Sequence, residues 1–193
     1  EPRMSALSIL PDEPWIQEKF SETELKLLQA WRKRVPLHTS SMGRLFDAVA
    51  SVLELVDVQT FEGEAAMKLE ALARTYWKNG AVEFRSPKTD KLRSTQSLLR
   101  EVLDKRKEGN DPSQIAAAFH HDLIQWIAQV TDDLNIRQLA FSGGVFQNAL
   151  LVDMCHHYLG EKYTLFFHQQ LSPNDENIAF GQMIHYLIQQ SKI

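Results

Sequence analysis

The sequence predicts a helix-rich α/β fold with two or three short strands. Two short runs of apolar and aromatic residues, 137–142 and 163–168, lie on either side of a helical pattern over 148–159. Along most of the remaining chain, apolar residues recur at three- and four-residue intervals, which indicates the buried faces of helices. Two strands that are joined by a helix imply parallel pairing through a right-handed crossover. We therefore expect a small parallel sheet with helices on its faces.

Residues 4–35 are predicted to form helices that prolines interrupt. Pro11 breaks the first helical pattern, because its ring removes a backbone N–H and clashes with the preceding turn. Ser21 and Glu24 match a capping box, in which two side chains satisfy free N–H groups at a helix start. Pro36 is expected to end this helix.

The middle of the chain is predicted to hold further helices and one short strand. Helical spacing extends over residues 42–55, and Gly63 opens another helix. Residues 81–85 are predicted to form a short strand. Asp111 and Pro112 start a long helix, because aspartate caps free N–H groups and proline suits the first helical position.

A pair of glycines follows the first of the two C-terminal strands. Ser142, Gly143 and Gly144 end the strand, and Asn148 precedes the next helical segment. Without a Cβ, glycine lets backbone N–H groups approach an anion closely, and the following helix adds a positive dipole end. Such a corner suits a phosphate group, although glycine turns also close many ordinary strand–helix units.

Three acidic positions are candidates for ligand binding. Asp175 lies between the second strand and the C-terminal helix, where a carboxylate can bind a divalent metal; the alternative is a helix cap. Asp47 can accept a hydrogen bond from a ribose hydroxyl; the alternative is a half-exposed aspartate paired with Arg44 or an amide. Glu62 and Glu64 are expected to stabilise the positive end of the helix after Gly63.

Histidine and cysteine give no sign of a metal or nucleophile site. The seven histidines lack the four-residue spacing with which a helix binds zinc, so we interpret them as core-edge or surface residues. The single cysteine, Cys155, is interpreted as a small buried apolar residue, since no activating base is evident beside it.

Composition excludes several classes of partner. A net charge of −4 and a pI near 6.0 argue against a nucleic-acid-binding surface. One cysteine excludes an intrachain disulfide, and a cytoplasmic location is expected. No apolar run reaches the ~18 residues of a spanning helix, so no membrane is expected as partner. The first residues resemble neither a signal peptide nor a start site, which indicates a fragment of a longer protein.

The strongest functional signal comes from five segments taken in order. They are SSMGRLFDAVASVL (40–53), FEGEAAMKLEALA (61–73), IAAAFHHDL (115–123), LAFSGGVFQNALL (139–151) and NDENIAFGQ (174–182). Together these segments resemble one family, the HypF carbamoyltransferases that act in the maturation of [NiFe] hydrogenases. The resemblance covers nearly the whole chain, and GRLFDAVA with SGGVFQN are its most specific parts.

The resemblance implies both a fold and a reaction. Residues 1–193 would be the C-terminal portion of a domain similar to the threonylcarbamoyl transferases, a partial second lobe of the ASKHA (actin/Hsp70-like ATPase) fold. The family makes carbamoyl-AMP from carbamoyl phosphate and ATP, and passes the carbamoyl group to the C-terminal cysteine of HypE. The implied cofactors are ATP or carbamoyl-AMP and a divalent metal, either zinc, iron or magnesium.

The resemblance also assigns binding residues, although no catalytic residue. Six positions match the family's binding motifs. They are the ribose-binding Asp47, the nucleotide-contacting Gly63, the adenosine- and phosphate-loop residues Gly143, Gly144 and Asn148, and the metal-ligating Asp175.

Two departures from the family pattern lead to alternative functions. Glu176 and Asn177 replace two family glycines, and a carboxylate there repels phosphate. The family's paired metal histidines belong upstream of this segment, so the chain alone is expected to be inactive. One alternative is a lobe of a small-molecule O-carbamoyltransferase. The other is a non-catalytic remnant that only associates with partners.

Overall fold

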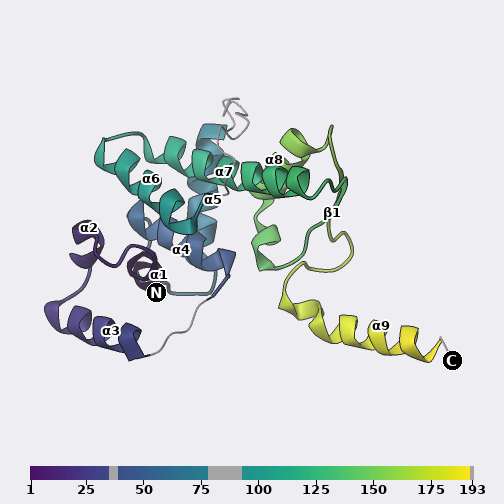
Figure 1. Cartoon of the computed structure of the whole chain (residues 1–193), viewed down its shortest axis with the longest axis horizontal. Helices are drawn as coiled ribbons and strands as arrows, with labels where there is room; N and C mark the ends of the chain where they lie inside the picture. The colour runs from purple at the N-terminus through teal and green to yellow at the C-terminus, as the bar shows by residue number, and fades with distance from the viewer. Residues whose placement is uncertain (35–38, 78–92, 192–193) are drawn as a thin grey trace. The chain divides into compact units, whose positions relative to one another are not determined.

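The computed structural model describes residues 1–34, 39–77 and 93–191, which fall into two compact units. Unit 1 spans Glu1–Trp126 and unit 2 spans Ile127–Ile193; helix α7 (Pro112–Asp133) runs across the boundary. Unit 1 also contains α1 (Pro2–Ile9), α2 (Pro14–Gln17), α3 (Glu22–Arg34), α4 (Met42–Val52), α5 (Glu64–Trp77) and α6 (Thr95–Lys107) (Figure 1). Unit 2 contains β1 (Gln138–Ala140), η1 (Gly144–Gln147), α8 (Ala149–Leu159), β2 (Thr164–Phe166), η2 (Asp175–Asn177) and α9 (Ile178–Gln190).

The core of unit 1 is built around helix α4. Every residue of α4 from Leu45 to Val52 is buried, and the helix contacts α1, α5 and α6 (Figure 1). A helix that is apolar on almost all sides needs such complete coverage. The rings of Phe46 and Phe119 meet edge to face with centroids 5.1 Å apart, which joins α4 to α7 within the core.

The predicted helix starts in unit 1 are confirmed by their hydrogen bonds. The Ser21 N–H donates to the Glu24 carboxylate at 2.7 Å, and the Glu24 N–H donates to the Ser21 hydroxyl at 3.3 Å, as in a capping box. The carboxylate of Asp111 accepts from the Ser113 N–H at 2.7 Å and caps α7. Pro36 and the predicted strand 81–85 lie outside the described residues.

Unit 2 contains the predicted parallel strand pair. Strand β1 pairs with β2 in parallel, with Gln138 opposite Thr164 and Ala140 opposite Phe166, and α8 forms the connection between them. Each strand has three residues, fewer than predicted. The buried side of α8 carries apolar residues, among them Met154. The helix-rich α/β class is therefore confirmed, with two strands in the described part of the chain.

Helix α9 forms where predicted, but none of its residues is buried. Its large apolar side chains follow helical spacing along one side. They are Phe180, Met183, Ile184, Leu187 and Ile188, each at least 40% exposed. We refer to these five residues as the α9 stripe. No helix in the described part of the chain has the length and apolar character to cross a membrane.

The histidine interpretation needs one correction. His120 and His121 are buried in the core of unit 1, whereas they were predicted at its edge or on the surface. The His120 ring packs against Phe46 and Phe119, and burial lowers the pKa of His120 to about 4. The exposed histidines are His156, His157, His168 and His185; His38 lies outside the described residues. Cys155 is buried as predicted, and burial raises the pKa of its thiol to about 12.

Candidate functional site

The glycine bend after β1 is fixed by a backbone conformation that excludes side chains. Gly143 has φ +105°, a region that residues with a Cβ rarely adopt. Its N–H donates to the carbonyl of Pro173 at 2.7 Å. The bend is therefore joined directly to the segment that leads into η2. The first glycine N–H is used for this contact and is not available to an anion, which corrects the expectation that both glycines offer theirs.

The free N–H groups of the bend belong to the second glycine and to the residue after it. Gly144 begins η1, and the Phe146 N–H closes the turn on the Gly143 carbonyl at 3.0 Å. Within the described residues, the N–H groups of Gly144 and Val145 have no acceptor. A Cβ on Gly144 would lie 3.9 Å from the Cβ of Asn174, so the bend is adjacent to the loop that carries Asn174. Two unpaired N–H groups in succession are suited to an anion.

Asn148 serves the fold at the start of α8. Its side-chain oxygen accepts from the Leu151 N–H at 2.8 Å, and the residue is 8% exposed. This is an N-cap, which satisfies one of the free N–H groups of the helix. The Asn148 oxygen is therefore engaged with the backbone of α8, and its predicted contact with a nucleotide remains a prediction.

Asp175 lies in the loop before α9 and does not cap the helix there. The cap of η2 is Asn174, whose side-chain oxygen accepts from the Glu176 N–H at 3.2 Å and the Ser172 hydroxyl at 2.8 Å. The alternative in which Asp175 caps the helix is therefore wrong. Asp175 is exposed and directly follows Asn174, the residue beside Gly144. The glycine bend and the Asp175 loop thus lie side by side in unit 2.

The described residues do not complete a metal site at Asp175. Nowhere in the described ranges do three or more histidine, cysteine, aspartate or glutamate side chains gather in a way that could hold a metal ion. A divalent cation such as magnesium or calcium takes about six ligands. Asp175 could supply one of them at most, so no chemical step is assigned here to a metal.

A contact between the two strand ends was missed by the sequence analysis. His168 Nε2 lies 3.1 Å from the hydroxyl oxygen of Ser142, and both side chains are exposed. Ser142 follows the end of β1 by two residues, and His168 follows the end of β2 by two. The signal that could have found them is this equal offset, because parallel strands place equivalent ends at the same edge.

Asp47 is a buried acceptor in unit 1. Its carboxylate accepts from the Gln59 side-chain amide at 3.0 Å and lies 3.0 Å from an Arg44 guanidinium nitrogen. The predicted alternative partners, Arg44 and an amide, are thus present, but Asp47 is 3% exposed rather than half-exposed. Burial raises the pKa of this carboxyl. Oδ2, the oxygen that faces Arg44, is buried and has no donor of hydrogen-bond geometry among the described residues.

Gly63 is required by the turn that starts α5. Its φ of +85° favours glycine, and a Cβ there would meet no atom within 4 Å. Glu64 accepts from the Thr60 N–H at 2.7 Å and pairs with Lys68 at 2.8 Å, which confirms its predicted role at the helix start. The Lys68 hydrogen bond lowers the pKa of Glu64 to about 2. The connector that carries Gly63 also supplies the Gln59 amide to Asp47.

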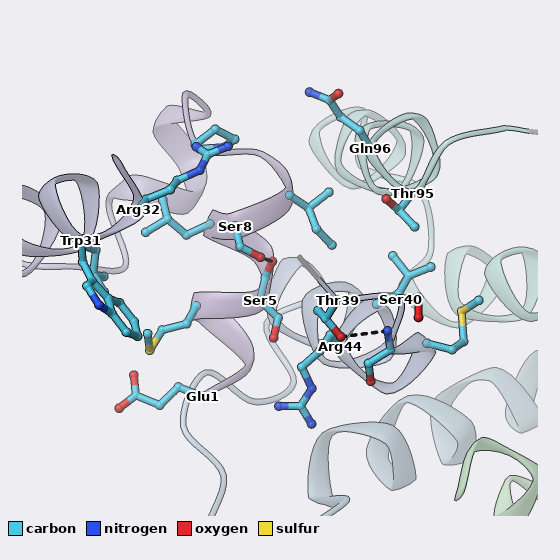
Figure 2. A pocket seen from close by; sticks show the side chains of 18 of the residues that line it. Glu1, Ser5, Ser8, Trp31, Arg32, Thr39, Ser40, Arg44, Thr95 and Gln96 are labelled. Carbon is cyan, nitrogen blue, oxygen red and sulfur yellow. Dashed lines mark hydrogen bonds between the residues drawn. The ribbon is translucent and has the colours of Figure 1, made fainter. Parts of the chain in front are cut away.

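Unit 1 also has a pocket of about 910 Å³, shown in Figure 2. Residues of α1, α3, the start of α4 and the start of α6 line it, and most of its lining is apolar. None of the six predicted site residues is among the described residues that line the pocket. Arg44, the ion-pair partner of Asp47, is a lining residue. We therefore assign the candidate site to the strand ends of unit 2 rather than to this pocket.

The sequence and the fold both match proteins of known class. The family described as "Carbamoyltransferase, Kae1-like Domain, second subdomain" matches residues 1–182. The Synechocystis protein named carbamoyltransferase HypF is 30% identical over 172 residues, which are 82% of this chain and 21% of that protein. A Methanocaldococcus jannaschii protein named probable carbamoyltransferase HypF is 25% identical over 176 residues, 88% of this chain and 23% of that protein.

Solved structures agree with these sequence matches. A crystal structure of full-length HypF in the phosphate- and nucleotide-bound form superposes with a TM-score of 0.76 at 26% identity. The superposition covers 93% of this chain and 30% of that protein. The structure of HypF from T. kodakarensis gives a TM-score of 0.64 at 26% identity, covering 90% of this chain and 25% of that one. The chain spans only about a fifth of the length of the curated relatives described above.

Proposed function

The chain belongs to the HypF carbamoyltransferase family, and from this membership we propose that it is the nucleotide-binding part of a carbamoyltransferase. One observation carries the proposal: the glycine bend and the Asp175 loop lie side by side. Gly143 bonds to Pro173 at 2.7 Å, and Gly144 lies beside Asn174. The bound nucleotide of the solved full-length relative supports the same ligand class.

The proposed nucleotide is ATP or carbamoyl-AMP. The free N–H groups of Gly144 and Val145 would bind its phosphate, because an anion gains most from donors that are already oriented. Taken within unit 1 alone, the predicted role of Asp47 is to accept a hydrogen bond from a ribose hydroxyl, as acidic residues do in dinucleotide sites. Asp175 would contribute one ligand to a divalent cation. The roles of Asn148 and Gly63 toward the nucleotide belong to the same proposal.

The proposed reaction moves a carbamoyl group from oxygen to sulfur. The donor is carbamoyl-AMP, formed from carbamoyl phosphate and ATP, and the acceptor is the C-terminal cysteine of a HypE-like protein. The cysteine thiolate attacks the carbamoyl carbon, a C–S bond forms, and the C–O bond to the phosphate of AMP breaks. AMP leaves with the electron pair. Donors at the bend would stabilise the negative charge on this leaving phosphate.

The proposal concerns a larger enzyme than these 193 residues. Because the chain spans about a fifth of its relatives, we propose that it is the C-terminal portion of a HypF-type transferase domain acting in [NiFe] hydrogenase maturation. The chain alone is expected to bind nucleotide without transferring a carbamoyl group. A cytoplasmic location is part of the same proposal.

Calorimetric titration of the 193-residue chain with AMP tests the binding step. We expect saturable binding, and at least a tenfold weaker affinity in Gly144→Val, whose branched side chain covers the free N–H groups. Gly181→Val in α9 is the matched control, because it makes the same change at an exposed helical glycine where a Cβ meets nothing within 4 Å. Equal affinities in all three proteins would reject the bend as the phosphate site. No binding by the unaltered chain would favour a remnant that only associates with partners.

A chimera tests the transfer step. This chain would replace the matching segment of the Synechocystis protein, and carbamoyl transfer would be measured to a peptide ending in the HypE cysteine and to small hydroxyl compounds. We expect transfer to the cysteine, with loss of rate in Asp175→Ala and Gly144→Val. Transfer to the hydroxyl compounds alone would instead indicate a small-molecule O-carbamoyltransferase.

A further inference from the structure

Ser142 and His168 form a polar pair at the carboxyl edge of the strand pair. Their side chains are 3.1 Å apart, from the hydroxyl oxygen to Nε2. Each residue follows its strand by two positions, and the strands run parallel, so the pair lies at the edge where ligands of α/β sheets bind. Both side chains are exposed, and neither is needed to fill the core.

The pair offers a hydrogen-bond donor in every protonation state. If the Ser142 hydroxyl donates to Nε2, the His168 ring carries its proton on Nδ1, and that N–H is free to donate. If Nε2–H donates to the Ser142 oxygen, the hydroxyl proton is free instead. In the charged imidazolium, both the Nδ1–H and the hydroxyl are available. A tautomer change therefore moves the free donor without removing it.

Ser142 is close in sequence to the free N–H groups of the bend. It precedes Gly144 by two residues, and consecutive Cα atoms are ~3.8 Å apart. The N–H of Gly143 is already bonded to Pro173, which leaves the bend with the N–H groups of Gly144 and Val145. An anion with several oxygens needs more than two donors to replace its water.

We propose that Ser142 and His168 bind the phosphate group of the nucleotide together with the N–H groups of Gly144 and Val145. This inference rests on the proposed function, because it names further residues of the same phosphate site. It also gives the site a way to tolerate the carboxylate of Glu176, which lies two residues after Asn174, the residue beside Gly144. Added donors offset the repulsion that a nearby carboxylate exerts on phosphate.

A merely structural role for the pair makes a different prediction. The hydrogen bond could simply tie the ends of β1 and β2 together. In that case its loss would lower the stability of the chain and would lower the affinity for every ligand of the site alike. If the pair binds phosphate, its loss lowers the affinity only for ligands that carry phosphate. The ratio of AMP affinity to adenosine affinity therefore separates the two roles.

The test is calorimetric titration of the full 193-residue chain with AMP and, separately, with adenosine. We expect His168→Ala and Ser142→Ala each to lower the affinity for AMP about tenfold and to leave the affinity for adenosine unchanged. His168→Gln, which keeps a side-chain N–H, is expected to recover most of the AMP affinity. His185→Ala is the matched control, since His185 is also exposed but lies on α9.

The outcomes separate this inference from the function on which it rests. AMP binding that is the same in the unaltered chain, His168→Ala and Ser142→Ala overturns the inference and leaves the proposed function in place. An equal loss for AMP and adenosine overturns it in favour of the structural role. No AMP binding by the unaltered chain overturns the proposed function, and the inference with it.

Discussion

Unit 1 and unit 2 differ in how completely their apolar side chains are buried. Of the seventeen large apolar residues that are exposed in the described part of the chain, twelve lie in unit 2, which holds about a third of the residues. In unit 1 many large side chains are fully buried, including Phe46 of α4 and Phe119 of α7. In unit 2 the α9 stripe and Phe166 of β2 remain exposed.

The difference separates stability from binding. Burial of apolar surface is the main favourable contribution to folding, so unit 1 should supply most of the stability of the chain. Binding residues are found more often on loops held by a rigid scaffold. In unit 2 the candidate phosphate site is built from a strand-end bend and a loop, joined by the Gly143–Pro173 hydrogen bond. Four predictions test this division.

The largest effect is expected from a large-to-small change in the core of unit 1. Phe46→Ala should destabilise the chain by about 3–5 kcal/mol, because it leaves a cavity beside Phe119. Phe180→Ala in the α9 stripe should change stability by less than about 0.5 kcal/mol, because that ring is 47% exposed. Urea unfolding followed by circular dichroism measures both. Similar losses in the two variants would mean that stability is spread over both units.

Acid sensitivity should also arise in unit 1, from His120. Its pKa is about 4 in the fold and 6.5 in the unfolded chain, so the unfolded chain takes up the proton first as the pH falls. Stability is therefore full above pH 6.5 and is lost progressively towards pH 4, by about 3 kcal/mol. His120→Leu should remove this loss.

The pH measurement is a difference between two proteins. Asp122 has its pKa raised to about 6 by burial, so its contribution is present at low pH and is lost as the pH rises through 6. His121, whose pKa burial also lowers to about 4, contributes a loss of its own at low pH. The contributions of Asp122 and His121 are common to the unaltered chain and His120→Leu, so they cancel in the difference. Unfolding free energies from pH 4 to 7 give that difference. A value independent of pH would contradict the assignment to His120.

A smaller effect is expected inside unit 2. The Tyr163 hydroxyl donates to Asp132 at 2.6 Å, which joins the end of α7 to the residue before β2. Tyr163→Phe should lower the free energy of unfolding by about 1 kcal/mol, the usual net contribution of one intramolecular hydrogen bond. Tyr186→Phe is the control, because Tyr186 is 61% exposed on α9. Equal unfolding free energies in the two variants would show that this bond contributes nothing.

The smallest change in stability is expected in the α9 stripe, together with a change in association. Leu187 is 56% exposed, and a continuous apolar stripe favours self-association. We expect the chain to self-associate through this stripe as its concentration rises, and Leu187→Asp to reduce that association without changing the unfolding free energy by more than about 0.5 kcal/mol. Sedimentation velocity measures the oligomer, and Gln189→Asp on the same helix is the control. If Gln189→Asp acts as strongly, charge rather than the stripe is responsible.

Most of the fold could be predicted from local patterns. The parallel strands, the Ser21–Glu24 capping box and the helix start at Asp111 follow from periodicity and capping, which depend on neighbouring residues. The buried positions of His120 and His121 were missed, because burial depends on which helices cover α7. An adjacent pair of histidines gives no local sign of that packing.

The candidate site was predicted only in part. Glycine at 143 indicated a bend, but that its N–H is used by Pro173 depends on a contact thirty residues away in sequence. The cap at Asn174 is a local contact, but Asn174 and Asp175 are adjacent residues of types that both cap helices, so the sequence does not decide between them. The Ser142–His168 pair depends on strand register, which the sequence does not state directly.

The central claim is that the bend at Gly144 and Val145 binds phosphate. The most direct measurement is a titration of the isotope-labelled chain with AMP, followed through the backbone amide resonances of these two residues. We predict that both resonances shift in a saturable way, and that adenosine shifts them far less. Saturable AMP binding that leaves both resonances unmoved would contradict the claim.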